Sequence, residues 1–207
     1  MNSVDDRFIE LVWQGFLALS GWEAIAALLG VTYVILATRE SIWCWPAAFT
    51  STLIYTLLFW EGQLPMQSLL HIYYMAMALY GWRSWRANRQ TNQVLVITSK
   101  SVQFHALFIT AGVALSLMVA YYLEQNVASK QPYLDAFVTV FAVMNTVLIA
   151  KKVLEAWLYW IVIDSAAIVL YFQTGYYVTI VMFMLYLVLA AYGYKNWRAL
   201  KEQANVT

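Results

Sequence analysis

The chain is a succession of long apolar segments separated by short polar ones. About 20 mostly apolar residues are needed to cross the roughly 30 Å of hydrocarbon in a bilayer. Seven segments approach that length, and they cover residues 22–37, 43–60, 66–82, 104–123, 134–150, 156–172 and 176–194. The pattern predicts an all-α membrane protein with seven transmembrane helices.

A different pattern precedes the first span. Between residues 8 and 20, apolar side chains such as Phe8, Leu11 and Trp13 alternate with Glu10 and Gln14, which stand four positions apart. This spacing puts the polar residues on one face of a helix and the apolar residues on the other. We expect residues 1–21 to form an amphipathic helix that lies on the membrane surface.

The segment that closes the third predicted span recurs near the end of the seventh. Tyr80-Gly81-Trp82 returns as Tyr192-Gly193-Tyr194, at an offset of 112 positions (192 − 80 = 112). The same offset relates further pairs, which are Trp85 and Trp197, Trp45 and Trp157, Arg39 and Lys151, and Thr52 and Asp164. One offset across three helices predicts two related three-helix repeats, residues 22–86 and 134–198.

The number of spans in a repeat fixes how the two copies are oriented. A second copy placed directly after three spans would be inverted in the membrane. The linker and fourth span, residues 87–133, return the chain to the other side, so both copies run in the same direction. This predicts a SWEET-like 3+1+3 plan, with two parallel repeats related by an axis along the membrane normal and the solute site between them. A tail, residues 199–207, follows.

Charge orients the predicted helices. Basic residues favour the short loops on the cytoplasmic side of a membrane protein. With the N-terminus outside, ten of the twelve basic residues fall inside, namely Arg39, Arg83, Arg86, Arg89, Lys100, Lys151, Lys152, Lys195, Arg198 and Lys201. The bias predicts an N-out, C-in orientation.

Composition agrees with a membrane protein and excludes several kinds of site. Hydrophobic residues make up 63% and charged residues 11% of the 207 residues, whereas an ordinary soluble domain is roughly a quarter charged. Cys44 is the single cysteine, which leaves no internal disulfide. No second Cys or His stands at metal-ligand spacing, so we expect no metal and no cofactor. The net charge of +1 gives no indication of a nucleic-acid partner.

Asp164 is the most informative polar residue, because it lies inside the sixth predicted span. A carboxylate there costs at least about 2.5 kcal/mol on insertion scales, so it should face a cavity or a partner. Trp160 and Tyr171 share its helix face, and aromatic walls beside one anion suit an aromatic cation. We therefore expect a solute site; a carboxylate hydrogen-bonded to a neighbouring helix is the structural alternative. Trp157, on the same face, we interpret as a membrane-interface anchor.

Other polar residues inside the spans complete the predicted substrate-binding set. Gln67, His71 and Tyr74 form a stripe in the third span at steps of four and three. Asn145 is an amide well inside the fifth span, and Thr52 is the repeat equivalent of Asp164. Unequal residues at equivalent positions are what an asymmetric solute requires. For His71, a hydrogen-bonded packing role is an equal alternative.

Three motifs are more specific than these patterns. Trp43-Cys44-Trp45-Pro46 opens the second span, Tyr80-Gly81-Trp82-Arg83-Ser84-Trp85 closes the third, and Trp157-Leu158-Tyr159-Trp160-Ile161-Val162-Ile163-Asp164 lies in the sixth. With these motifs the chain resembles the PnuC family of bacterial B-vitamin transporters over nearly its whole length. The resemblance implies facilitated diffusion of an unphosphorylated vitamin through the inner membrane, trapping by a cytoplasmic kinase, and a homotrimer. It implies neither a coupling ion nor ATP.

Within that family, two features are similar to the thiamine-type branch, PnuT: the Trp-Cys-Trp-Pro opening and the run Tyr73-Tyr74-Met75. Nicotinamide riboside transporters often carry a glutamine late in the fifth span, where this chain reads Asn145-Thr146-Val147. We expect thiamine, an aromatic cation, as the substrate and nicotinamide riboside as the alternative. An intramembrane enzyme or a vitamin-binding receptor subunit is the alternative of another class. An enzyme should show converging catalytic groups, and the sequence shows none, so we expect no enzyme.

Overall fold

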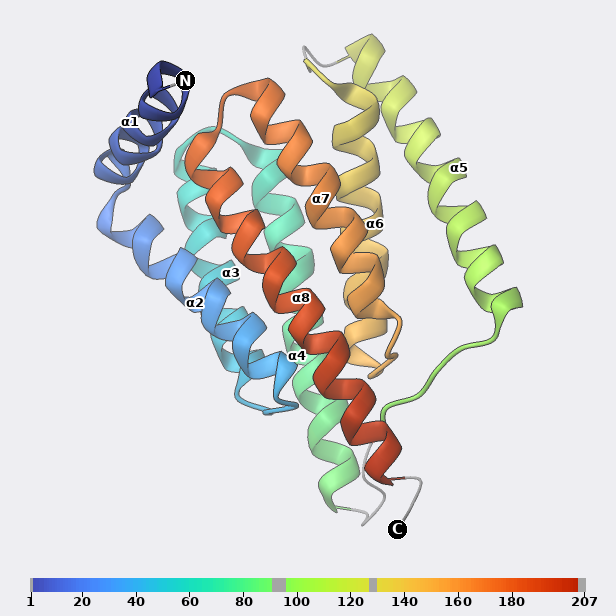
Figure 1. Ribbon diagram of the computed structural model, residues 1–207. Helices are drawn as coiled ribbons and strands as arrows, with labels where there is room; N and C mark the ends of the chain where they lie inside the picture. Colours follow the sequence, from blue (N-terminus) through green and yellow to red (C-terminus); the bar gives the residue numbers. More distant parts are fainter. Residues whose placement is uncertain (1, 91–95, 127–129, 205–207) are drawn as a thin grey trace. The chain divides into compact units, whose positions relative to one another are not determined.

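The computed structural model describes residues 2–90, 96–126 and 130–204, and these ranges contain eight α-helices (Figure 1). They are α1 (Asn2–Ala18), α2 (Gly21–Thr38), α3 (Cys44–Glu61), α4 (Pro65–Gln90), α5 (Val102–Asn126), α6 (Pro132–Ala150), α7 (Ala156–Thr174) and α8 (Tyr177–Ala204). Each predicted span falls on one of the helices α2 to α8, and the amphipathic segment falls largely on α1. Residues 91–95 and 127–129 of the predicted linker, and 205–207 of the tail, lie outside the described ranges.

Within the described ranges, five helices are long and apolar enough to cross a membrane, and these are α2, α5, α6, α7 and α8. The helix α4 is more polar, and α3 carries three Thr residues and one Ser residue among its apolar side chains. In α3 the hydroxyl groups bond to backbone carbonyl oxygens: Thr50 Oγ1 donates to Pro46 O at 3.0 Å and Ser51 Oγ donates to Ala26 O of α2 at 2.7 Å. Such bonds satisfy polar groups inside a helix bundle. The hydroxyl groups of α3 are thus compatible with a place among apolar helices.

The start of α2 is fixed by hydrogen bonds between side chains and the backbone. Ser20 accepts a hydrogen bond from the backbone N–H of Glu23, and the Glu23 carboxylate accepts one from the backbone N–H of Ser20. This reciprocal capping box satisfies two N–H groups that the first turn of a helix leaves free. Ser20 therefore ends the segment that contains α1 and begins the next helix.

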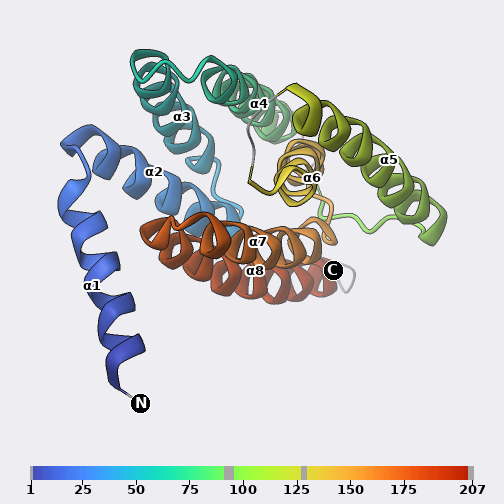
Figure 2. The ribbon, with the colours of Figure 1, turned by 90° about the horizontal axis from the view of Figure 1, so that it is seen from above.

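The chain divides into two compact units. The first unit contains Met1–Leu19, Lys100–Asn145 and Leu158–Val188. In it α5 lies beside α6 (Figure 2), where the Phe108 and Phe141 rings are 6.2 Å apart. A side chain at Gly112 would meet the Phe141 ring at 2.5 Å, so the small residue permits the close approach. The helix α1 contacts α8 through the Phe8 and Tyr177 rings, 5.8 Å apart.

The second unit contains Ser20–Ser99, Thr146–Trp157 and Leu189–Thr207. In it α3 packs against α2 and α4. The segment before α5 lies against the turn between α6 and α7, because Thr98 exchanges backbone hydrogen bonds with Lys152 and Leu154 at 3.0 and 2.9 Å. This unit therefore joins the ends of α2, α4 and α8 to the turn that precedes α7.

Candidate functional site

The polar face of α7 belongs to the first unit. Asp164 lies near the middle of this helix and is only 3% exposed. Trp160, one turn earlier, and Tyr171, two turns later, are half-buried. Across the residues that the structure describes, Asp164 makes no hydrogen bond and no ion pair. A buried carboxylate without a partner is unfavourable for stability, and a ligand could supply the missing contact.

Aromatic rings extend this face toward the end of α7. The Tyr171 ring stacks on Phe183 of α8 with centroids 5.3 Å apart, and Phe183 meets Tyr186 edge-on at 5.8 Å and 84°. These rings form a wall of flat apolar surface in the same unit as Asp164.

A second aromatic group surrounds His71 of α4 in the second unit. Its ring centroid lies 5.0 Å from Phe59, 5.3 Å from Tyr55 and 5.9 Å from Tyr74. His71 Nδ1 is 2.9 Å from the backbone carbonyl oxygen of Gln67. A carbonyl oxygen only accepts, so Nδ1 carries the proton, and in the neutral ring Nε2 is then a hydrogen-bond acceptor.

The two aromatic groups are related by the offset of 112 positions. Phe59, His71 and Tyr74 correspond to Tyr171, Phe183 and Tyr186, and the edge-on contact of 5.9 Å at 86° in one group matches 5.8 Å at 84° in the other. Their polar atoms differ, because one group carries an imidazole where the other carries a phenyl ring. The two aromatic groups thus have similar ring geometry but carry different hydrogen-bonding atoms.

The remaining predicted residues are placed less uniformly. Asn145 is fully buried in α6. Thr52 Oγ1 donates to Ala48 O at 2.8 Å and to Phe49 O at 3.0 Å, so its hydroxyl is engaged within its own helix. The Gln67 side chain is exposed, and its backbone oxygen rather than its amide contacts His71. Of the predicted set, the second unit therefore brings His71 and Tyr74 together, while α7 carries Trp160, Asp164 and Tyr171 in the first.

Four tryptophans form a cluster in the second unit, which we call the tryptophan cluster: Trp45, Trp85, Trp157 and Trp197. Trp45 meets Trp85 at 5.3 Å and 85°, Trp157 meets Trp197 at 5.4 Å and 88°, and Trp85 lies 6.2 Å from Trp197. Trp157 is 2% exposed. The interpretation of Trp157 as a membrane-interface anchor is therefore wrong, because its ring is enclosed by protein.

The glycines of the repeated Tyr-Gly motif make room for this cluster. A side-chain carbon added at Gly81 would lie 2.3 Å from the Trp45 ring, and one at Gly193 would lie 2.7 Å from the Trp157 ring. Both contacts are far shorter than the 3.5–4.0 Å or so at which carbon atoms attract each other. The repeated motif thus has a steric reason in both copies.

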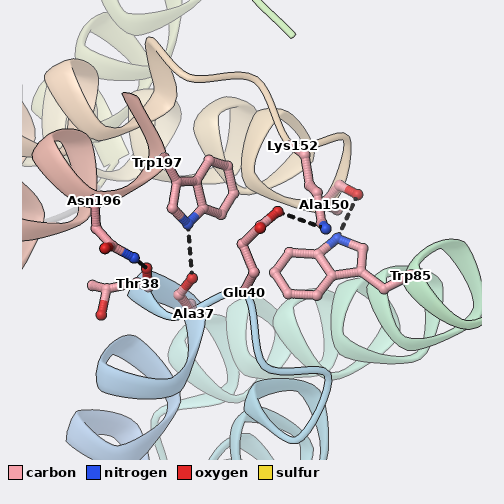
Figure 3. Close-up of polar contacts among 8 residues, drawn as sticks. All are labelled: Ala37, Thr38, Glu40, Trp85, Ala150, Lys152, Asn196 and Trp197. Atoms are coloured by element: carbon pink, nitrogen blue, oxygen red, sulfur yellow. Dashed lines mark hydrogen bonds and ion pairs between the residues drawn. The ribbon is translucent and has the colours of Figure 1, made fainter. Parts of the chain in front are cut away.

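Hydrogen bonds from two cluster tryptophans and from Asn196 reach the backbone of the other predicted repeat (Figure 3). Trp85 Nε1 donates to Ala150 O at the end of α6 at 3.1 Å, and Trp197 Nε1 donates to Ala37 O near the end of α2 at 3.0 Å. Asn196 adds a bond from Nδ2 to Thr38 O at 2.8 Å. The first predicted repeat donates to the second and the second donates to the first, as in a two-fold contact.

An ion pair lies beside Trp85 of the tryptophan cluster (Figure 3). Lys152 Nζ is 2.7 Å from Glu40 Oε1 and 4.7 Å from the centroid of the Trp85 ring. Sequence reasoning named Lys152 only as a basic loop residue and did not name Glu40. The signal was available, because the offset of 112 makes Glu40 and Lys152 equivalent positions.

A pocket of about 220 Å³ also opens between α3 and α4. Trp45, Phe49 and Trp82 line it together with smaller residues. None of the predicted substrate-binding residues lies in its wall.

Comparison with known proteins places these features in a family. The family model for the nicotinamide mononucleotide transporter matches residues 20–199. The riboflavin/roseoflavin transporter RibM of Streptomyces davaonensis is 27% identical over 180 residues, which cover 84% of this chain and 83% of that protein. The nicotinamide riboside transporter PnuC of Escherichia coli is 22% identical over 204 residues, with 86% and 85% covered. PnuC of Haemophilus influenzae is 23% identical over 206 residues, with 95% and 88% covered.

A solved structure is also similar to this chain. The crystal structure of the vitamin B3 transporter PnuC superimposes with a TM-score of 0.72 at 20% identity, over 98% of this chain and 93% of that one. At this level of identity the similarity concerns the fold.

Proposed function

The chain belongs to the nicotinamide mononucleotide transporter family, the family of PnuC and RibM, and from this premise we propose that it carries an unphosphorylated, aromatic B vitamin by facilitated diffusion. It is a multi-pass protein of the bacterial inner membrane and a vitamin transporter.

The proposed architecture has seven spans in a 3+1+3 plan, N-out and C-in. Equivalent turns support it: Gln63 and Gly175, 112 positions apart, both have left-handed backbones, with φ of 57° and 87°. Leu64 N–H bonds to Phe59 O and Tyr176 N–H bonds to Tyr171 O, which again are equivalent pairs. Together with the bias of basic residues toward one set of loops, this supports two parallel repeats.

The observation that carries the substrate class is Asp164, buried at 3% exposure and without a polar partner among the residues described. A cationic ring would neutralise the carboxylate and could stack on Trp160 one turn away. Nicotinamide riboside and thiamine are both aromatic cations, whereas riboflavin is neutral. Because this chain is similar to proteins named as nicotinamide riboside transporters, nicotinamide riboside is the first candidate and thiamine the second.

The proposed substrate contacts are the eight residues that sequence reasoning selected. Trp160, Asp164, Asn145 and Tyr171 would contact the vitamin from the second repeat, and Thr52, Gln67, His71 and Tyr74 from the first. In this scheme Asp164 faces the positive ring, and His71 Nε2 accepts from an N–H or O–H of the vitamin. A homotrimer and trapping by a cytoplasmic kinase complete the proposal.

Two experiments test it. Purified protein in liposomes should admit radiolabelled nicotinamide riboside down its gradient, at the same rate with and without a proton or sodium gradient. An intramembrane enzyme or a receptor subunit would bind or convert the vitamin without admitting it. A binding titration with nicotinamide riboside, thiamine and riboflavin then ranks the substrates. Tightest binding of neutral riboflavin would overturn the role of Asp164 as the counter-charge.

A further inference from the structure

The Glu40–Lys152 ion pair occupies a special place in the repeat. Two residues at equivalent positions of a two-fold arrangement lie on opposite sides of its axis and at equal distances from it. The charged atoms of this pair are 2.7 Å apart although 112 positions separate the residues. If the two repeats are related by such an axis, as the proposed function assumes, the axis passes between these two side chains.

The surrounding contacts obey the same geometry. Trp85 and Trp197 are also equivalent, and their rings lie 6.2 Å apart, so this second pair straddles the axis as well. The bonds from Trp85 to Ala150 and from Trp197 to Ala37 cross it in opposite directions, with acceptors one position away from exact equivalence (150 − 112 = 38). At this end of the helices the two repeats are therefore in direct contact, and a solute that moves between them along the axis would meet the ion pair.

The backbone holds both charged residues in the same uncommon conformation. Glu40 has φ of 52° and Lys152 has φ of 51°, and both N–H groups close equivalent turns, to Ala37 O and Ile149 O, each at 3.0 Å. Non-glycine residues adopt this left-handed region rarely, and functional sites are enriched in such cases. Two turns of the same conformation thus direct the Glu40 carboxylate and the Lys152 ammonium toward each other.

The surroundings of the ion pair stabilise it and still allow it to separate. The Lys152 side chain is 9% exposed and its ammonium lies over the Trp85 ring, while the Glu40 side chain is 24% exposed. Water can therefore reach Glu40 when the pair separates, and the Trp85 ring retains an attraction for the ammonium.

From these contacts we infer that Glu40, Lys152 and Trp85 form a latch that closes the cytoplasmic end of the vitamin pathway and must open for release. The role is distinct from substrate binding, because none of the three belongs to the proposed substrate contacts. It rests on the proposed function in that the vitamin passes between the repeats.

The chain carries its own reporter for this latch. Cys44 is the single cysteine, is fully buried, and directly precedes Trp45 of the tryptophan cluster. A buried thiol is inert toward alkylation until the structure around it opens. The rate at which N-ethylmaleimide alkylates Cys44 in folded protein therefore reports how often this end opens, and it requires no vitamin.

The test compares Glu40→Gln, Lys152→Gln and the charge exchange Glu40→Lys/Lys152→Glu with the wild type. Each single variant should raise the alkylation rate about tenfold or more and lower the maximal rate of vitamin uptake. The exchanged pair should restore both, because Lys at position 40 could lie over Trp197, the equivalent of Trp85. Glu202→Gln is the matched control, since Glu202 pairs with Arg198 within α8 at the surface, and it should change neither rate.

Two results would overturn the latch. If Cys44 in both single variants is alkylated at the wild-type rate, the pair does not hold this end closed. If Cys44 is alkylated fast in the single variants and also in the exchanged pair, the effect comes from lost packing. Should Glu40→Gln fail to fold, Glu40→Asp keeps the charge and shortens its reach, and it should give an intermediate rate. A wild-type protein that admits no vitamin would instead refute the proposed function, while the alkylation results would still decide whether the latch exists.

Discussion

Glu40 and Lys152 are separated by 112 residues, share a left-handed backbone, and join their side chains at 2.7 Å. A contact between equivalent positions requires that the two turns meet where the repeats face each other. It also requires unequal side chains, since two identical charges at this distance would repel. In the proposed arrangement of two parallel repeats, the pair therefore lies at the symmetry axis, and it is also a position at which the two repeats differ in sequence.

Replacing Asp164 by Asn should weaken vitamin binding about tenfold or more, the equivalent of roughly 1.4 kcal/mol, because the variant cannot neutralise a cationic ring. The variant should melt at the same temperature as the wild type or higher, since a buried charge without a partner opposes folding. Thermal unfolding and a binding titration measure the two effects. Glu124→Gln is the control, because Glu124 is exposed and accepts from Tyr133 in the same unit. Unchanged affinity together with a lower melting temperature would assign Asp164 a structural role.

Replacing His71 by Phe copies the equivalent residue of the other repeat, Phe183, which lies among Tyr171 and Tyr186 in matching geometry. The fold should therefore be kept. Affinity for the vitamin should fall several-fold, because a neutral hydrogen bond contributes about 0.5–1.5 kcal/mol and the variant lacks the Nε2 acceptor. Isothermal titration would measure the loss, and circular dichroism would check the fold. Wild-type affinity would leave His71 with a packing role alone.

Ala at Gly81 or Gly193 should destabilise the protein by about 1–3 kcal/mol or more, because the added methyl group would overlap a tryptophan ring. Ala at Gly21 is the matched control. A side-chain carbon there meets no atom within 4 Å, and this position in the first turn of α2 should tolerate it. Thermal unfolding in detergent compares the three variants. Equal melting temperatures for all three would contradict the packing described for the tryptophan cluster.

Trp85→Phe and Trp45→Phe remove the same atoms from two buried rings of one cluster. Trp85 Nε1 donates to Ala150 O, whereas Trp45 Nε1 has no hydrogen-bond partner among the residues described. Trp85→Phe should therefore be the more destabilising change by about 1 kcal/mol, the contribution of one buried hydrogen bond. Chemical unfolding curves of both variants measure the difference, and a larger loss at Trp45 would contradict it.

The helices could be predicted from the sequence because apolar runs of near-bilayer length leave few alternatives for the backbone. The family was also within reach, since motifs such as Tyr80-Gly81-Trp82 carry it. The offset of 112 identified Trp45 and Trp157 as equivalents, yet it could not show that both rings are buried together. Whether equivalent residues meet depends on their distance from the axis, and sequence spacing does not contain that distance.

The predicted substrate-binding residues likewise include features that the sequence could predict and features that it could not. A step of four residues correctly put Asp164 and Trp160 on one face of α7, because helix periodicity is local. It could not show that the Thr52 hydroxyl bonds within its own helix, nor that the Gln67 side chain is exposed. The choice among vitamins was beyond the sequence pattern, since several aromatic cations fit one acid beside aromatic rings.

If the chain is built from two parallel repeats, as proposed, the unequal Glu40–Lys152 pair has a consequence for how the two halves recognise each other. A hypothetical protein assembled from two copies of residues 22–86 would bring Glu40 against Glu40, and one assembled from two copies of residues 134–198 would bring Lys152 against Lys152. Like charges at such a distance repel, so each half prefers its counterpart over a copy of itself. In that arrangement the single chain resembles a heterodimer whose two subunits are covalently joined, and the Glu40–Lys152 pair favours the association of unlike halves.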